Sequence, residues 1–229
     1  MNTKTIVLHY KKGKERKQNM IDQLTKFGFT DYSFYEQYDG NELTEHDINT
    51  MYQPKVKNPL LWMNKVSLWG PAALHYHSPQ LNLAEISLTI KFGKVFELLS
   101  KEDFDYCIVF EDDVILCDDF AKKFKEYMEK TPKDWDVIYF GSGANLHPKN
   151  PTVDVVAYTK DHPASRCGDS IIFTKKVIQD LVSTWFPFNL ISDWELGYQH
   201  YLHKHKVYWW EPSLSRQGSE TGTFKSELR

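Results

Sequence analysis

Three consecutive carboxylates, Glu111, Asp112 and Asp113, are the residues of this sequence best suited to carry chemistry. They follow the apolar run 107–110, whose lack of polar alternation predicts a strand buried on both faces. Ligands of open α/β sheets bind at the carboxyl ends of strands, and adjacent carboxylates repel one another unless a cation lies between them. The triplet therefore predicts a divalent-metal site, with a solvated turn after a strand as the alternative.

The residues around the triplet predict an α/β fold. Residues 5–10 and 32–38 are expected to be strands, joined by a helix that ends at Gly28, which makes a right-handed crossover unit. A long helix is expected over 82–100, where Asn82 and Glu85 have capping-box spacing. Further strands are expected at 135–141, 153–158, 170–173 and 206–210, and further helices begin at the caps Asp118 or Asp119, at Thr174 and at Ser192. The prediction is one domain, residues 1–229, with a mixed, mostly parallel central sheet flanked by helices.

Two segments depart from this pattern. Residues 53–79 contain four prolines among tryptophans, tyrosines and histidines, which predicts an irregular insertion that serves as a binding element or lid. Within it Trp62 or Trp69 would stack on a sugar ring or, as we favour, anchor the segment to the core. The polar tail 211–229 contains Gly218 and Gly222 and is expected to be a mobile segment that closes over a ligand.

Composition narrows the class of protein. The net charge of -3 gives no reason to expect a nucleic-acid partner. No run approaches the roughly 20 apolar residues of a membrane-spanning helix, so we expect no membrane span. The 3 cysteines cannot all pair within the chain, which favours reduced thiols and a cytoplasmic location.

Several short motifs, in this order and spacing, resemble glycosyltransferase family 25, which includes bacterial lipooligosaccharide galactosyltransferases and the transferase domains that act on collagen hydroxylysine. The motifs are Glu15-Arg16, Tyr38-Asp39-Gly40, residues 84–89, 109–114 and 135–141, and Arg216-Gln217-Gly218-Ser219. The resemblance implies a GT-A fold, a nucleotide-sugar donor carried by uridine diphosphate, a glycan or glycoprotein acceptor, Mn²⁺ or Mg²⁺ bound through a DxD-like motif, and inversion at the anomeric carbon. Many members have Ser-His where this chain has Lys91-Phe92, and the segment 53–79 is longer than is usual in the family, which leaves the acceptor undefined.

The resemblance also implies roles for individual residues. Asp113 is expected to ligate the metal together with Glu111, while Glu111 and Asp112 hold the ribose, the sugar or metal-bound waters. The remaining donor-binding residues are expected to be Asp39 near the base, Lys91 or Arg216 at the diphosphate, and Gln217.

An inverting transfer needs a base that accepts the proton of the acceptor hydroxyl. Asp193 is the candidate by family position, and Asp169 is the reserve candidate or an acceptor-binding residue. The alternative for Asp193 is a structural role at a helix N-terminus, where Ser192 and Glu195 have capping-box spacing, and we assign Glu195 to capping.

Two other classes of protein remain open at this stage. A magnesium-dependent phosphohydrolase would also place carboxylates at strand ends, but it would favour an aspartate nucleophile on the first strand, where this chain has Ile-Val-Leu-His-Tyr. A non-catalytic carbohydrate-binding protein would use the aromatic insertion but would not need adjacent carboxylates. His200, His203 and His205 are left unassigned, because no cysteine lies near them to complete a zinc site.

Overall fold

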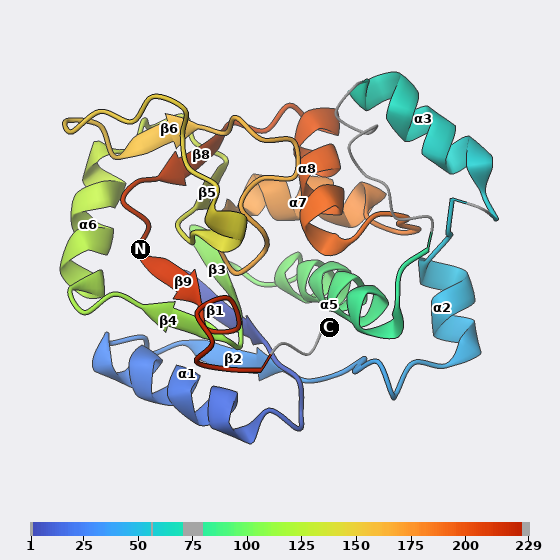
Figure 1. Ribbon diagram of the computed structural model, residues 1–229, viewed down its shortest axis with the longest axis horizontal. Helices are drawn as coiled ribbons and strands as arrows, with labels where there is room; N and C mark the ends of the chain where they lie inside the picture. The colour runs from blue at the N-terminus through green and yellow to red at the C-terminus, as the bar shows by residue number, and fades with distance from the viewer. Residues whose placement is uncertain (1, 56, 71–79, 226–229) are drawn as a thin grey trace.

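A seven-stranded mixed sheet forms the centre of the computed structural model, which describes residues 2–55, 57–70 and 80–225 (Figure 1). Its strand order is β2-β1-β3-β7-β5-β8-β6. The strands are β1 (Thr3–Leu8), β2 (Tyr32–Tyr35), β3 (Tyr106–Glu111), β5 (Val137–Tyr139), β6 (Ala157–Thr159), β7 (Ser170–Thr174) and β8 (Val207–Trp210).

Strand β7 lies between β3 and β5 and runs antiparallel to both. Its direction determines which segments lie together at the edge of the sheet where β1 and β3 end. β1 pairs in parallel with β2 and β3, so the carboxyl ends of β1 and β3 lie together. Because β7 runs in the opposite direction, its first residue, Ser170, pairs with Phe110 near the end of β3. The acidic triplet therefore lies beside the chain that enters β7. The predicted mixed, mostly parallel sheet flanked by helices is confirmed.

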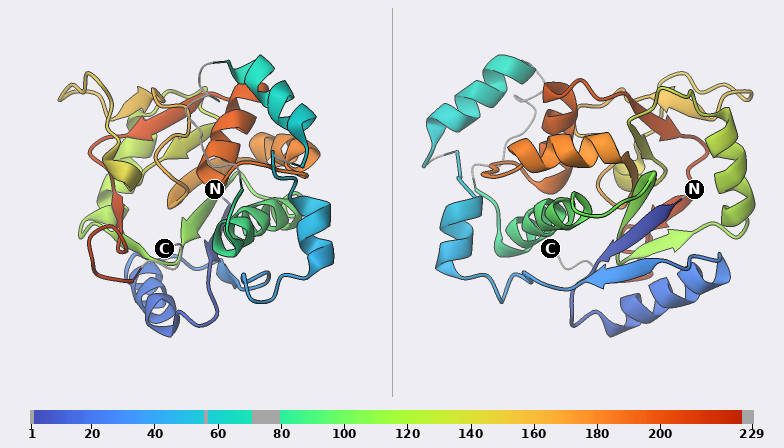
Figure 2. Two further views of the ribbon diagram at one scale, coloured as in Figure 1. Left: turned by 45° about the vertical axis from the view of Figure 1, so that its right-hand side comes forward. Right: turned by 180° about the vertical axis from the view of Figure 1, so that it is seen from behind.

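Helices cover both faces of the sheet (Figure 2). One face packs against α5 (Leu83–Leu99), α7 (Lys175–Thr184) and α8 (Ser192–Leu202), and the other against α1 (Lys14–Lys26) and α6 (Phe120–Lys130). The predicted capping box of α5 is confirmed, since Asn82 accepts from the Glu85 amide and Glu85 accepts from the Asn82 amide. A Cβ at Gly93 would lie 2.3 Å from Trp185, so glycine permits the close packing of α5 on the chain after α7.

The insertion 53–79 is not irregular throughout, which corrects the prediction. Residues Pro59–Trp69 form helix α3, whose N-cap Asn58 accepts a hydrogen bond from the Leu61 amide. Proline at the first helical position is compatible with a helix because its missing N–H would have no partner there. Trp69 is buried against α8, so the anchoring interpretation holds for it. Residues 71–79 lie outside the described part of the chain.

Other element boundaries also differ from the predictions. Helix α2 (Glu45–Met51), which begins with a capping box at Thr44, was not predicted. The strand expected at 153–158 is shorter and begins at Ala157. The expected caps Asp119 and Thr174 precede their helices but make no side-chain capping hydrogen bond.

The tail contributes a strand that the sequence analysis missed. β9 (Ser215–Gln217) pairs antiparallel with β4 (Val114–Leu116), which directly follows the acidic triplet. The 3₁₀ helix η1 (Gly143–Asn145) lies in the loop after β5.

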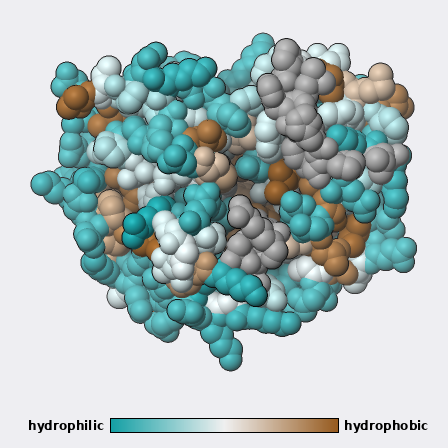
Figure 3. Space-filling view, viewed as in Figure 1, coloured by the Kyte–Doolittle hydropathy of each residue, from teal (hydrophilic) through white to brown (hydrophobic). Residues whose placement is uncertain are grey.

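Among the described residues, no helix combines the length and apolar character that a membrane span requires. The surface in the view of Figure 3 is predominantly hydrophilic.

Candidate functional site

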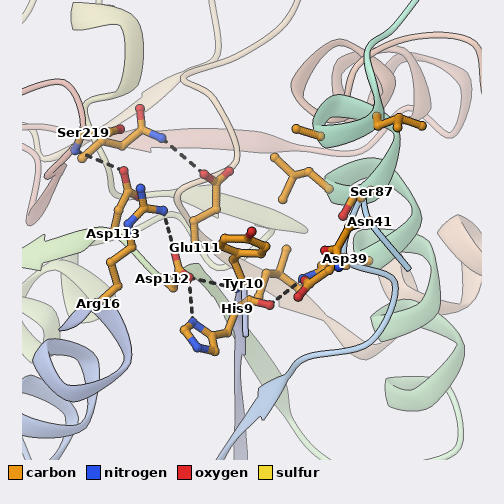
Figure 4. Close-up of a pocket in the computed structure, with 17 residues that line it drawn as sticks. His9, Tyr10, Arg16, Asp39, Asn41, Ser87, Glu111, Asp112, Asp113 and Ser219 are labelled. Atoms are coloured by element: carbon orange, nitrogen blue, oxygen red, sulfur yellow. Dashed lines mark hydrogen bonds and ion pairs between the residues drawn. The ribbon is translucent and has the colours of Figure 1, made fainter. Parts of the chain in front are cut away.

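A pocket of about 360 Å³ lies at the edge where β1 and β3 end (Figure 4). Asp113 and Ser219 lie at one end of it and Asp39 and Ser87 at the other, with Glu111 between them. Pockets of this size hold small-molecule ligands in proteins. The other labelled residues that line it are His9, Tyr10, Arg16, Asn41 and Asp112.

Asp112 is held entirely by groups of the chain. One oxygen, Oδ2, lies 2.7 Å from Nδ1 of His9 and accepts from the Tyr10 amide at 3.0 Å, and Oδ1 accepts from Arg16 at 3.0 Å. Burial raises the pKa of Asp112, but these hydrogen bonds and the charge of Arg16 outweigh it, so the pKa is lowered overall. The side chain therefore fixes the pocket wall, and a ligand would have to displace one of these partners to reach it.

Asp113 and Asp169 each keep a buried oxygen without a hydrogen-bond partner, Oδ1 and Oδ2 respectively. The two residues are only 4% and 1% exposed. Burial, followed by the charge of Asp113, raises the pKa of Asp169 to about 7. Burial also raises the pKa of Glu111 well above its usual value, and the charges of Asp113 and Asp169 add to this effect. Asp113 and Asp169 therefore each have a buried oxygen that receives no hydrogen bond, and the negative charge of Asp113 lies close enough to raise the pKa of both Asp169 and Glu111.

A divalent cation fits this donor set. The described residues contain no group of three or more His, Cys, Asp or Glu side chains already placed to hold a metal. Mg²⁺ and similar cations, however, commonly bind through one or two carboxylates together with waters and substrate phosphates. The unpartnered Oδ1 of Asp113 and the neighbouring carboxylate of Glu111 meet that requirement.

Two glycines allow Asp169 to approach the end of β3. A Cβ at Gly141 would lie 2.0 Å from Oδ2 of Asp169, and one at Gly168 would lie 2.8 Å from the Phe92 ring. The Glu111 amide donates to the Asp169 carbonyl at 2.9 Å, which ties the end of β3 to the start of β7. A larger residue at 141 would therefore displace the Asp169 carboxylate, and one at 168 would press on the Phe92 ring and lie 3.1 Å from Oε1 of Glu111.

Asp193 lies in the first turn of α8 and accepts a hydrogen bond from the Trp194 amide at 2.9 Å. Burial raises its pKa to about 6, in opposition to the hydrogen bonds from the Trp194 amide and its own. Its charge also raises the pKa of Glu111, but by less than burial or the charge of Asp113 or Asp169 does. Neither Asp193 nor Asp169 lines the pocket itself.

The assignment of Glu195 to helix capping is wrong. The N-cap of α8 is Ile191, and no side chain caps the helix. Glu195 is fully buried and forms an ion pair with Lys65 of α3 at 2.5 Å, and it also accepts from Gln199. The spacing matched a capping box, but the buried lysine is a stronger partner for a carboxylate that is removed from water.

The structure brings most of the predicted donor-binding residues together. Lys91 donates to Asp39 and to the His9 carbonyl, each at 2.5 Å, and this buried ion pair lines the pocket. Gln217 also lines the pocket and donates to Glu111 at 3.4 Å. Arg216 does not join them: it is exposed and lines a separate depression beside β4.

The sequence analysis assigned no role to His9, Tyr10, Arg16 or Ser219, although Arg16 and Ser219 stand in two of the family motifs. Leu8 is the register partner of Glu111, so His9 and Tyr10 extend beyond β1 next to Asp112. The sequence could have predicted this position, because parallel strands end at the same edge of a sheet and His9 and Tyr10 directly follow the first strand. Nε2 of His9 is a further buried atom without a hydrogen-bond partner.

Comparisons with solved structures give distant similarities. A197 from STIV has a TM-score of 0.44 and 13% identity, covering 94% of this chain and 83% of that one. S. aureus TarS 1–349 with UDP-GlcNAc has a TM-score of 0.45 and 13% identity, covering 94% and 58%. A mutant Drosophila β-1,4-galactosyltransferase 7 in complex with manganese, UDP-Gal and xylobiose has a TM-score of 0.43 and 13% identity, covering 93% and 66%.

Sequence comparison is decisive about the family. The curated proteins contain no match. The family model described as glycosyltransferase family 25 (LPS biosynthesis protein) matches residues 2–184, which include the acidic triplet, Asp39, Lys91 and Asp169. The resemblance drawn from the motifs is thereby confirmed, and the chain belongs to glycosyltransferase family 25 and is a glycosyltransferase.

Proposed function

We propose that this protein transfers a sugar from a uridine diphosphate sugar to a hydroxyl of a glycan or glycoprotein acceptor, with inversion at the anomeric carbon. The observation that carries the proposal is the unpartnered, buried Oδ1 of Asp113 at one end of a pocket of about 360 Å³. Uridine diphosphate is the carrier that the family resemblance implies. Free thiols at Cys107, Cys117 and Cys167 agree with a cytoplasmic location.

Asp113, together with Glu111, would hold Mn²⁺ or Mg²⁺ in this proposal. A divalent cation bound there supplies positive charge that neutralises the diphosphate as it leaves. The basic side chains among the described residues that line the pocket already have carboxylate partners, since Arg16 is paired with Asp112 and Lys91 with Asp39. The nucleoside would occupy the opposite end of the pocket, near Asp39, Asn41 and Ser87.

Asp193 would act as the general base. A carboxyl with a pKa of about 6 is ionised at neutral pH and is still basic enough to accept a proton from a hydroxyl in the transition state. Burial supplies the basicity that the helix N-terminus would otherwise reduce. Asp169, with a pKa of about 7 and lying deeper, is the second candidate for this role or for binding the acceptor.

Calorimetric titration of uridine diphosphate, with and without Mn²⁺, tests the donor site. We expect binding that requires Mn²⁺ and is at least about tenfold weaker in Asp113→Asn, because the cation loses a direct ligand. Asp118→Asn is the matched control, since this nearby carboxylate is fully exposed. Equal binding with and without Mn²⁺, or equal binding by Asp113→Asn, would contradict the metal site. Absence of binding would exclude uridine diphosphate, and guanosine and thymidine diphosphates would be titrated next.

A further inference from the structure

The tail residues 217–225, here called the C-terminal clasp, contact two acids of the triplet directly, Glu111 and Asp113. Gln217 donates to Glu111 at 3.4 Å. The amides of Gly218 and Ser219 donate to the backbone carbonyl and to Oδ2 of Asp113, at 2.7 and 3.2 Å. The clasp therefore touches both residues to which we assign the metal.

Arg16 links the third acid to the clasp. Its guanidinium donates to Oδ1 of Asp112 at 3.0 Å and also to the backbone carbonyl of Lys225. The side chains of Arg16 and Asp112 are 11% and 7% exposed, so solvent screens this ion pair only weakly. Figure 4 shows Arg16 beside Asp112 and Asp113, at the end of the pocket where Ser219 lies. One side chain thus joins helix α1, the end of β3 and the clasp.

The contacts of the clasp determine which carboxylate oxygen of Asp113 is available to a ligand. The Ser219 amide occupies Oδ2, while Oδ1 remains buried without a partner. A carboxylate with one oxygen fixed by an amide is already oriented, so a cation at the other oxygen would bind without first ordering the side chain. This orientation depends on residue 219, which lies beyond the segment matched by the family model.

We propose that Arg16 is a positioning residue that fastens the C-terminal clasp to the acidic triplet and thereby orients Asp113 and Glu111 for the cation and diphosphate. The ligand named here rests on the proposed function, whereas the fastening of the clasp does not. A role limited to global stability would instead weaken every element of the fold equally.

Amide hydrogen exchange in the ligand-free protein tests the fastening. We expect the Ser219 and Phe224 amides, which bond to Asp113 and Gly218, to exchange at least about tenfold faster in Arg16→Gln. The central strand β3 should exchange at the wild-type rate. Lys14→Gln is the control, because it removes one positive charge from an exposed position of the same helix. Unchanged clasp exchange in Arg16→Gln, or equal acceleration in β3, would overturn the proposal.

Titration of uridine diphosphate with Mn²⁺ tests the consequence for the site. Affinity should fall by about tenfold in Arg16→Gln and remain unchanged in Lys14→Gln, a coupling of ordinary size. Ser219→Pro, which removes the amide donor to Asp113, should reproduce the loss. Wild-type affinity in both Arg16→Gln and Ser219→Pro would overturn the positioning role. If the wild type binds no nucleotide, the proposed function fails, and the exchange rates alone decide whether Arg16 fastens the clasp.

Discussion

Two buried polar clusters of this protein differ in whether their atoms have partners. At the sheet edge, Asp113 and Asp169 each retain an unpartnered oxygen. The histidine cluster, formed by Tyr139, Asp180, His200 and His205, is fully connected: His200 bonds to Tyr139 at 3.0 Å and to His205 at 3.1 Å, and His205 bonds to Asp180 at 3.1 Å.

This difference indicates that the sheet edge is a ligand site and that the histidine cluster is a structural network. Burying a polar atom without a partner costs free energy, so folding alone gives no reason to keep one. At the sheet edge a bound cation would compensate that cost, whereas both ring nitrogens of His200 and of His205 are already satisfied within the chain. We therefore expect substitutions at the edge to change binding and catalysis, and substitutions in the histidine cluster to change stability.

The largest effect is expected for Asp193→Asn. Loss of a general base lowers kcat by about 10²- to 10⁴-fold, while the affinity for uridine diphosphate should not change. For the wild type, kcat/KM should decrease as the pH falls below about 6, because Asp193 must be ionised to accept a proton. Steady-state kinetics and calorimetry on the same preparations measure both quantities. A kcat reduced less than about tenfold would show that Asp193 is not the general base, and Asp169 would then be the candidate to test.

Gly141→Ala tests the edge without removing any charged group. Its new Cβ would lie 2.0 Å from Oδ2 of Asp169, so the carboxylate must move. We expect a loss of about 1–3 kcal/mol in the free energy of unfolding, together with reduced transferase activity. Denaturant unfolding and activity measurements check this. Wild-type activity in a destabilised variant would show that the position of Asp169 does not matter for catalysis.

His200→Phe should destabilise the protein to a similar extent but leave the donor site unchanged. Tyr139 and His205 would each lose a buried hydrogen-bond partner, which lowers the free energy of unfolding by about 1–3 kcal/mol. The affinity for uridine diphosphate with Mn²⁺ should remain that of the wild type. Urea unfolding and calorimetry provide the two measurements. A weakened nucleotide affinity would break the contrast between the two clusters.

The smallest effect concerns pH. Burial lowers the pKa of His200 well below its usual value, and the charges of His205, Lys160 and His203 act in the same direction. The unfolded chain therefore binds a proton near pH 6.5 that the folded chain does not bind, so stability decreases as the pH falls through about 6.5. The decrease should reach about 1.4 kcal/mol per pH unit for one proton and be smaller in His200→Phe. Parallel pH slopes in the two proteins would show that other groups are responsible.

Features that depend on neighbouring residues could be predicted from the sequence. The buried strand before the triplet and the capping box of α5 need only residues within a few positions of one another, and both are present. The family motif Tyr38-Asp39-Gly40 added Asp39, and Lys91, which stands where the chain departs from the family pattern, pairs with it at the pocket.

Features that depend on distant partners could not be predicted in this way. Glu195 matched a capping box locally, but its partner Lys65 lies 130 residues away. β9 is short and polar and forms only because β4 is available for pairing. Arg16 had no local sign of its contact with Asp112, which lies 96 residues away in the sequence.

The link between Arg16 and Lys225 also bears on the order in which the protein acquires its parts during synthesis. These residues are 209 positions apart, and chains emerge from the ribosome at about 5–20 residues per second. The sheet edge with β1 and β3 can form while the clasp is still being translated. We therefore expect the chain to bind uridine diphosphate only after the clasp has been synthesised and has joined this edge.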